Sequence, residues 1–409
     1  MTTGTQERRR DSPQRLSARS HAFFDPRTAV HFDERLDTWQ VFSRWDVLRV
    51  LNEKGTFSAG YGLSDEARLR SHPSLAGMWA AEGARHDDLR AVVAQPFRRT
   101  VLARLTREVR DIASALLDEV IESGTGRIEV VGTLADHLPS RVICRVLGLD
   151  LSYAERMRTW VEQMSQSTAA TNELPPQPDL VRFFQELIEL RRAAPRDGLV
   201  DDLIAAHEAG YLVDGRPMTE WDLVGYFAMM LSAGVDTTAT SIGNAFLFLT
   251  EYGCWGQLAH NPELVPNAIE ETLRWYPAFP GVRRYVLADT EVGGHHVRAG
   301  QWVTGWLTSA NRDPDKFPDP DRFDIHRRPN PHLSLGYGRH HCLGAPLARL
   351  ELRILIEEAA ARLPGLRRDT ERPISRREWI VDPLEQLHMV FEPPAGTPPP
   401  RRGGPAERS

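Results

Sequence analysis

Several common protein classes are excluded by what this sequence holds too little of. Its 409 residues include only three cysteines, Cys144, Cys254 and Cys342, and their spacing forms no pair. This argues against a disulfide framework and suits a reducing compartment. An excess of positive charge is also missing, since 50 Lys and Arg face 56 Asp and Glu, and the formal net charge of −6 argues against general nucleic-acid binding.

Features that direct a chain to a membrane are missing as well. Arg8, Arg9 and Arg10 are not followed by an apolar segment, so we expect neither a signal peptide nor a membrane anchor. The most apolar stretch, 227–249, is interrupted by polar residues, which favours a buried helix over a membrane span. We therefore expect a cytoplasmic protein with no membrane partner.

Nothing resembling a linker separates residues 21 and 392, where Pro and Gly are scattered as turn residues. We expect one large, mainly helical domain over 21–392. Residues 1–20 are polar and are expected to form a disordered arm. Residues 393–409 are rich in Pro and Arg and are expected to form a disordered tail.

The most informative feature present is the segment 335–344, which reads LGYGRHHCLG and contains the spacing G-x-G-x-H-x-C-x-G. From average residue frequencies this pattern arises about once in ten million start positions. A helix is predicted to begin at Ala345, with Pro346 in its first turn. Its free amides would point at the Cys342 sulfur and lower the pKa of the thiol.

Three other interpretations of this segment are weaker. A dinucleotide-binding fingerprint would need glycine at position 341, where the sequence has His341. A zinc site is disfavoured because consecutive side chains diverge and no second ligand pair accompanies them. The third alternative is a structural cysteine in a glycine-rich turn.

A second feature is a polar group inside an apolar helix. Thr219 to Asp222 has the form of a capping box, and the predicted helix runs towards Thr250. In its middle, residues 233–238 read AGVDTT. Glycine and a buried Asp are costly there, and such a violation indicates a functional site. The alternative is that Thr237 bonds the carbonyl four residues earlier and Asp236 pairs with an arginine.

Together the cysteine segment and this helix resemble the cytochrome P450 superfamily, the haem-thiolate monooxygenases. The resemblance implies a single large triangular fold, mainly α with small β-sheets, holding haem b between the I-type and L-type helices. Cys342 would be the axial ligand of the iron, and a thiolate in that position favours O–O cleavage. Gly344 would contact the haem beside it. Asp236 and Thr237 would handle protons during oxygen activation.

The resemblance also implies partners for the haem propionates, which need cationic or hydrogen-bonding groups. His86, Arg90, Arg284 and His340 occupy the matching positions, with the neighbouring Arg283 as an alternative to Arg284. For each residue taken singly, a solvated surface side chain is the alternative.

A third match is structural. Glu271 and Arg274 share one helix face and can pair. In the resembled family this pair binds a further arginine, here predicted to be Arg322. One departure is Leu335, which stands where the family usually has Phe.

The implied function is reductive activation of O2 and oxidation of a hydrophobic small molecule, in bacterial secondary metabolism or catabolism. Electrons would come from an external ferredoxin or flavodoxin with its reductase, since the chain carries no flavin motif. The substrate is free or tethered to a carrier protein. Alternatives on the same scaffold are ring closure, aryl coupling, O-demethylation and peroxide-driven oxidation. The alternative of another class is a non-catalytic haem-binding or partner-recruiting member.

Two surfaces are predicted less sharply. A basic docking surface for the electron donor could include Arg98, Arg99, Arg339 and Arg349. Candidate walls of the substrate pocket are the segments 60–79 and 161–184, together with Met229, Met230, Ala233, Ala278, Phe279, Pro280, Val282, Trp379, Ile380, Leu384 and Leu387.

Overall fold

The computed structural model describes residues 30–60, 77–94, 97, 99–171, 177–377, 381 and 383–392. Side chains are not described for 99–101 and 165–171. The predicted arm, 1–20, and the predicted tail, 393–409, lie outside the described residues.

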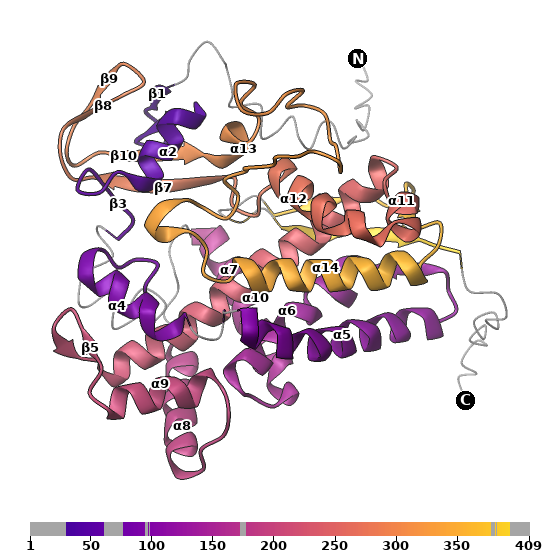
Figure 1. Ribbon diagram of the computed structural model, residues 1–409, viewed down its shortest axis with the longest axis horizontal. Helices are drawn as coiled ribbons and strands as arrows, with labels where there is room; N and C mark the ends of the chain where they lie inside the picture. Colours follow the sequence, from indigo (N-terminus) through magenta and orange to yellow (C-terminus); the bar gives the residue numbers. More distant parts are fainter. Residues whose placement is uncertain are drawn as a thin grey trace, which may run out of the picture.

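Helices make up most of the described chain (Figure 1), as the sequence predicted. Their bounds are α2 (Arg44–Asn52), α4 (Gly83–Val93), α5 (Arg99–Glu122), α6 (His137–Leu147), α7 (Ala154–Thr171), α8 (Pro178–Ala193), α9 (Leu199–Glu208), α10 (Glu220–Glu251), α11 (Trp255–His260), α12 (Val265–Trp275), α13 (Leu307–Ala310) and α14 (Ala345–Arg362). No helix in this part of the chain is long and apolar enough to cross a membrane.

A five-stranded sheet lies at one end of the molecule, at the upper left of Figure 1. Its strand order is β1 (Val30–Asp33), β2 (Thr38–Val41), β10 (Trp302–Trp306), β7 (Gly281–Val286) and β3 (Phe57–Ser58). Only β2 and β10 pair in parallel. The strand β7, which follows α12, lies between β10 and β3, so residues 281–286 lie beside the β3 segment.

The smaller sheets are hairpins and short ladders. One of them is a hairpin whose strands, 290–292 and 295–297, are joined by two glycines. The pairs are β5 (Leu212–Val213) with β6 (Arg216–Pro217), β8 (Thr290–Val292) with β9 (His295–Val297), β12 (Ser375–Arg376) with β13 (Leu384–Gln386), and β11 (Arg367–Arg368) with β14 (His388–Val390) and β4 (Arg127–Glu129).

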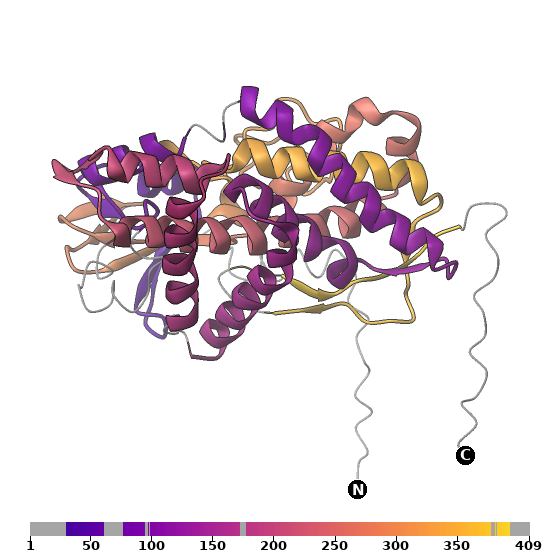
Figure 2. The same cartoon turned by 90° about the horizontal axis from the view of Figure 1, so that it is seen from below.

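The core of the helical region forms around α10. This helix begins as predicted, because the Thr219 side chain accepts the Asp222 N–H and Asp222 accepts the Thr219 N–H. Phe227, Phe246 and Phe248 on it are fully buried. It packs against α6, α12 and α14, while α14 lies beside α5 in both views (Figures 1 and 2). The helix that follows the cysteine segment is therefore packed directly on the helix that carries residues 233–238.

Candidate active site

The cysteine segment folds as a tight loop that leads directly into α14. The loop is closed by a hydrogen bond between its two ends, in which the Cys342 N–H donates to the Leu335 carbonyl at 2.8 Å. Gly338 has φ +68°, and a Cβ there would lie 2.2 Å from the amide oxygen of Asn52. Glycine is thus required by both the left-handed backbone and the close approach of α2. As predicted, α14 begins at Ala345, with Gly344 as its N-cap.

The Cys342 thiol has accessible surface, yet protein surrounds it closely on the other sides. Burial raises the pKa of the thiol, and the N–H groups of Gly344 and Ala345 oppose that rise. The charges of Arg90 and Arg349 also lower it. The N–H groups at the start of α14 therefore lower the pKa of the thiol, as expected from the helix dipole. Desolvation has the larger effect, so the pKa is raised overall.

Two histidines predicted from separate segments meet beside this loop. The rings of His86 on α4 and His340 lie 4.7 Å apart in an edge-to-face arrangement. His340 Nε2 is buried and has no hydrogen-bond partner among the described residues, with Glu82 Oε1 at 3.7 Å. Arg90, one turn after His86, is close enough to lower the pKa of His86, although burial contributes most to that shift.

Arg284 is the more deeply buried of the two arginines on β7. Successive strand residues point to opposite faces, and Arg283 lies over the Trp302 ring at 4.7 Å. Burial lowers the pKa of Arg284, and Glu82 opposes this. The Arg284 side chain donates to the carbonyl of Arg283, and it makes no ion pair with any carboxylate in the described part of the chain. Of the two arginines, Arg284 is therefore the better candidate for a propionate partner.

These groups together fit a haem. A half-buried guanidinium without a carboxylate in contact, and a buried imidazole nitrogen that makes no hydrogen bond among the described residues, are the donors that propionates need. Glu82 is near both Arg284 and His340, so the two donors lie in one region, next to the loop that carries the Cys342 sulfur. The donor set therefore matches a planar metal complex that bears two carboxylates.

The polar motif of α10 keeps part of a buried helix accessible. Ala233 is exposed and Thr237 is half-buried. The Thr237 hydroxyl donates to the Ala233 carbonyl at 2.7 Å, which is the bond expected in the purely structural alternative. Because a hydroxyl oxygen retains acceptor capacity while it donates, this bond leaves Thr237 able to receive a proton donor.

Asp236 lines a cavity of about 460 Å³ at the side of α10. Asp136, at the end of the π-helical turn Val131–Ala135, lines the same cavity, and so do Arg158 and Glu162 of α7. Burial raises the pKa of Asp136 to about 6, and the carboxylates of Glu162, Glu129 and Asp236 add to the rise. Sequence reasoning missed Asp136, because its environment comes from four separate elements.

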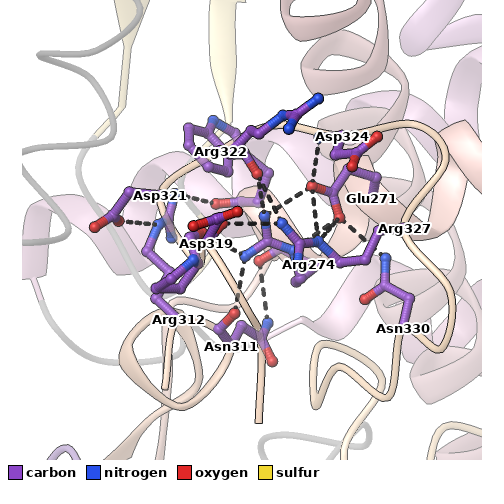
Figure 3. A network of polar contacts seen from close by, with 12 residues as sticks. Glu271, Arg274, Asn311, Arg312, Asp319, Asp321, Arg322, Asp324, Arg327 and Asn330 are labelled. Atoms are coloured by element: carbon purple, nitrogen blue, oxygen red, sulfur yellow. Dashed lines mark hydrogen bonds and ion pairs between the residues drawn. The ribbon is translucent and has the colours of Figure 1, made fainter. Parts of the chain in front are cut away.

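The predicted pair of Glu271 and Arg274 is completely buried, with contacts of 2.7 and 2.8 Å (Figure 3). The prediction that Arg322 is the third member of this group was wrong. Arg327, not Arg322, brings its guanidinium to Glu271, at 3.2 Å. Arg322 contributes only its backbone carbonyl, which accepts from Arg274 and Arg327. The chain turns between 322 and 327, so the later arginine faces the carboxylate.

Two of the arginines predicted for partner docking have internal partners. Arg339 is 19% exposed, pairs with Asp87 at 3.4 Å and donates to the Gly83 carbonyl at 2.8 Å, so it also holds the start of α4. Arg349 donates twice to Glu270. Arg98 and the Arg99 side chain lie outside the described residues, as do the pocket candidates 61–76, 172–176, Trp379 and Ile380.

The family model described as Cytochrome P450 matches residues 256–359 of this chain. The chain is 35% identical to a mycinamicin IV hydroxylase/epoxidase of Micromonospora griseorubida, over 81% of this chain and 83% of the relative. This chain belongs to the cytochrome P450 family. Its sequence-based identification is thereby confirmed.

Solved structures agree with this assignment. CYP109E1 from Bacillus megaterium, in complex with testosterone, has a TM-score of 0.81 at 28% identity and covers 94% of this chain and 98% of its own. P450BioI in complex with a fatty-acyl carrier protein has a TM-score of 0.80 at 26% identity, covering 93% and 98%.

Family membership establishes the general activity and confirms the predicted fold class. The chain is an oxidoreductase, a haem-dependent monooxygenase that uses O2 and redox partners. The alternative of a non-catalytic haem carrier is not favoured by relatives named as hydroxylases and oxygenases.

Proposed function

We propose that this P450 binds haem b with Cys342 as the axial ligand and oxidises a hydrophobic small molecule. The observation that carries the proposal is the meeting of Cys342, Arg90 and the paired rings of His86 and His340 beside the start of α14. When bound, the haem supplies reductive activation of O2 and transfer of one oxygen atom to the substrate.

Arg90, Arg284, His86 and His340 are proposed to hold the propionates. Two features support this role: the half-buried Arg284 has no carboxylate in contact within the described residues, and the buried Nε2 of His340 has no hydrogen bond there, its nearest carboxylate oxygen being Glu82 Oε1 at 3.7 Å. Gly344 lies beside the ligand, since its ideal Cβ position is 3.9 Å from the Cys342 sulfur.

Asp236 and Thr237 are proposed to deliver protons from different sides of one helical turn. Thr237 lies on the half-buried stretch beside Ala233, and Asp236 faces the polar cavity. In this arrangement Asp236 exchanges protons with groups in the cavity, and the Thr237 hydroxyl, which donates to the Ala233 carbonyl, offers an acceptor on the reacting side. A dedicated peroxygenase would not need this pair.

The substrate class is proposed from the relatives. One relative is named for mycinamicin IV and another for erythromycin, and a structural neighbour holds testosterone. Large hydrophobic substrates from secondary metabolism therefore fit best, with ring closure, aryl coupling and O-demethylation as variants of the outcome. The carrier-protein complex of another neighbour supports including tethered acyl chains among the candidates. The electron donor is proposed to be a ferredoxin or flavodoxin with its reductase, and the enzyme to be cytoplasmic.

The test is the reduced CO spectrum of Cys342→Ala beside wild type. Wild type should give the red-shifted band of thiolate ligation, and the variant should lose it or lose haem. Cys254→Ala is the matched control, because it removes a buried thiol at the N-cap of α11 and should leave the band unchanged. A Cys342→Ala protein that retains the band would contradict the assignment. Titration of wild type with erythromycin, testosterone and fatty acids then reads the substrate class from the Soret shift.

A further inference from the structure

One carboxylate, Glu270 on α12, contacts residues on both sides of the cysteine loop. Its two oxygens accept from Arg349 Nε at 2.7 Å and Nη2 at 2.8 Å. The same group lies 3.1 Å from His332 Nε2. His332 precedes Cys342 in the chain and Arg349 follows it on α14. The loop that carries the thiol is therefore fastened at both ends to a single side chain.

The upstream contact is directional. His332 is 2% exposed, and its Nδ1 accepts the Ser334 N–H at 3.3 Å. The ring proton must then be on Nε2, where it faces Glu270. Ser334 is itself fixed to α12, since its hydroxyl donates to the Leu273 carbonyl at 2.6 Å. The next residue, Leu335, accepts the Cys342 N–H. A continuous series of bonds thus connects Glu270 to the backbone of the cysteine.

The downstream contact brings charge to the sulfur. Arg349 lies in the second turn of α14, the helix that begins three residues after Cys342, so its guanidinium belongs to the part of the helix nearest the sulfur. Burial alone would raise the pKa of Glu270, but hydrogen bonds from Arg349 and His332 hold it at about 2. Glu270 is therefore ionised across the working pH range. A bidentate carboxylate also fixes the guanidinium in one orientation.

We propose that Glu270 is a positioning residue that fastens both ends of the Cys342 loop and sets, through Arg349, the net charge beside the sulfur. The inference rests on the proposed role of Cys342 as the iron ligand. Its consequence is electrostatic tuning: one-electron reduction adds negative charge at the metal centre, so nearby positive charge favours the reduced form. The carboxylate balances Arg349 and keeps that effect small.

Substitutions of Glu270 and of Arg349 should therefore shift the midpoint potential in opposite directions. Glu270→Gln leaves the Arg349 charge uncompensated and should raise the midpoint potential. Arg349→Gln leaves the carboxylate uncompensated and should lower it. The double variant should return close to wild type, because it removes equal and opposite charges. We expect each single change to alter the ferric/ferrous equilibrium several-fold, where tenfold corresponds to about 59 mV for one electron.

The experiment is spectroelectrochemical titration of the purified holoenzymes without a redox partner, so that docking does not enter. Arg353→Gln is the matched control, because Arg353 lies one turn further along α14 and is as exposed as Arg349, at 40% against 39%. Its potential should stay that of wild type. Arg349→Lys keeps the charge and should also stay near wild type, which provides a reading if Glu270→Gln does not retain haem.

Opposite shifts for the two single variants support the proposal. Shifts in the same direction, or no shift in Arg349→Gln, overturn it. The proposed function fails separately: in that case wild type lacks the thiolate CO band, or Cys342→Ala keeps it. A normal wild-type band with unshifted variants refutes the Glu270 inference alone.

Discussion

Replacement of Glu271 by Gln should destabilise the protein strongly, although the change exchanges only one oxygen for nitrogen. Glu271 is 0% exposed, and its oxygens receive Arg274 from two nitrogens and Arg327 from one (Figure 3). The Asp324 N–H donates at 2.8 Å and the Asn330 amide at 3.1 Å. Every contact made by the carboxylate is thus with a donor.

The magnitude follows from what the amide leaves behind. Glu271→Gln removes the negative charge between two guanidinium groups whose side chains are 0% and 8% exposed. It also places an NH2 group against existing donors. Removing one partner of a buried ion pair costs about 3–5 kcal/mol, because the remaining charge stays desolvated. With two cations affected, we expect the upper part of that range.

The assay is urea unfolding of the holoenzyme, followed by far-UV circular dichroism and by the Soret band. Asp111→Asn is the matched control, because Asp111 pairs with Arg107 at 3.9 Å on the exposed face of α5. That change should cost at most about 1 kcal/mol, as exposed pairs do. A Glu271→Gln variant within about 1 kcal/mol of wild type would refute the reasoning, since it would mean that the buried cations are solvated by other means.

Two further predictions concern α10 and its cavity. Asp136 has a pKa of about 6 in the folded protein, above its unfolded value of about 3.9. Its contribution to stability is therefore fully present below about pH 4 and is lost as the pH rises through about 6, by up to ~3 kcal/mol. Asp136→Asn should remove this slope, as urea titrations at a series of pH values will measure. Thr237→Ala should release more peroxide per NADPH consumed. Thr250→Ala, which loses the same kind of bond to the carbonyl four residues earlier, should not.

The elements that the sequence predicted well are those determined within one or two helical turns. The capping box at Thr219 and the opening of α14 at Ala345 depend on residues three positions apart or fewer, so their spacing is visible in the chain. The cysteine loop was predictable for a related reason. Two of its glycines, Gly336 and Gly338, have positive φ, a local requirement that is visible in the chain, and the proposed ligand residue follows them closely.

The features that the sequence did not predict depend on long-range packing. Arg322 and Arg327 are equally plausible partners for Glu271 in the sequence, and only the turns of the intervening loop decide between them. Asp136 has its raised pKa because the fold buries it and, to a smaller extent, because α7, β4 and α10 bring carboxylates towards it. Glu82, which is near both His340 and Arg284, was not visible either, because these residues come from three segments.

The adjacent residues Glu270 and Glu271 show how one helical turn can serve two purposes. Consecutive side chains on a helix point about 100° apart, so Glu271 enters the core while Glu270 stays 26% exposed at the cysteine loop. Glu271 therefore binds Arg274 of its own helix and Arg327 of the segment before the loop, and Glu270 binds the loop's own flanks. Their substitutions should separate accordingly. Glu271→Gln should lower the free energy of unfolding with little change in potential, and Glu270→Gln should shift the potential at a much smaller cost in stability.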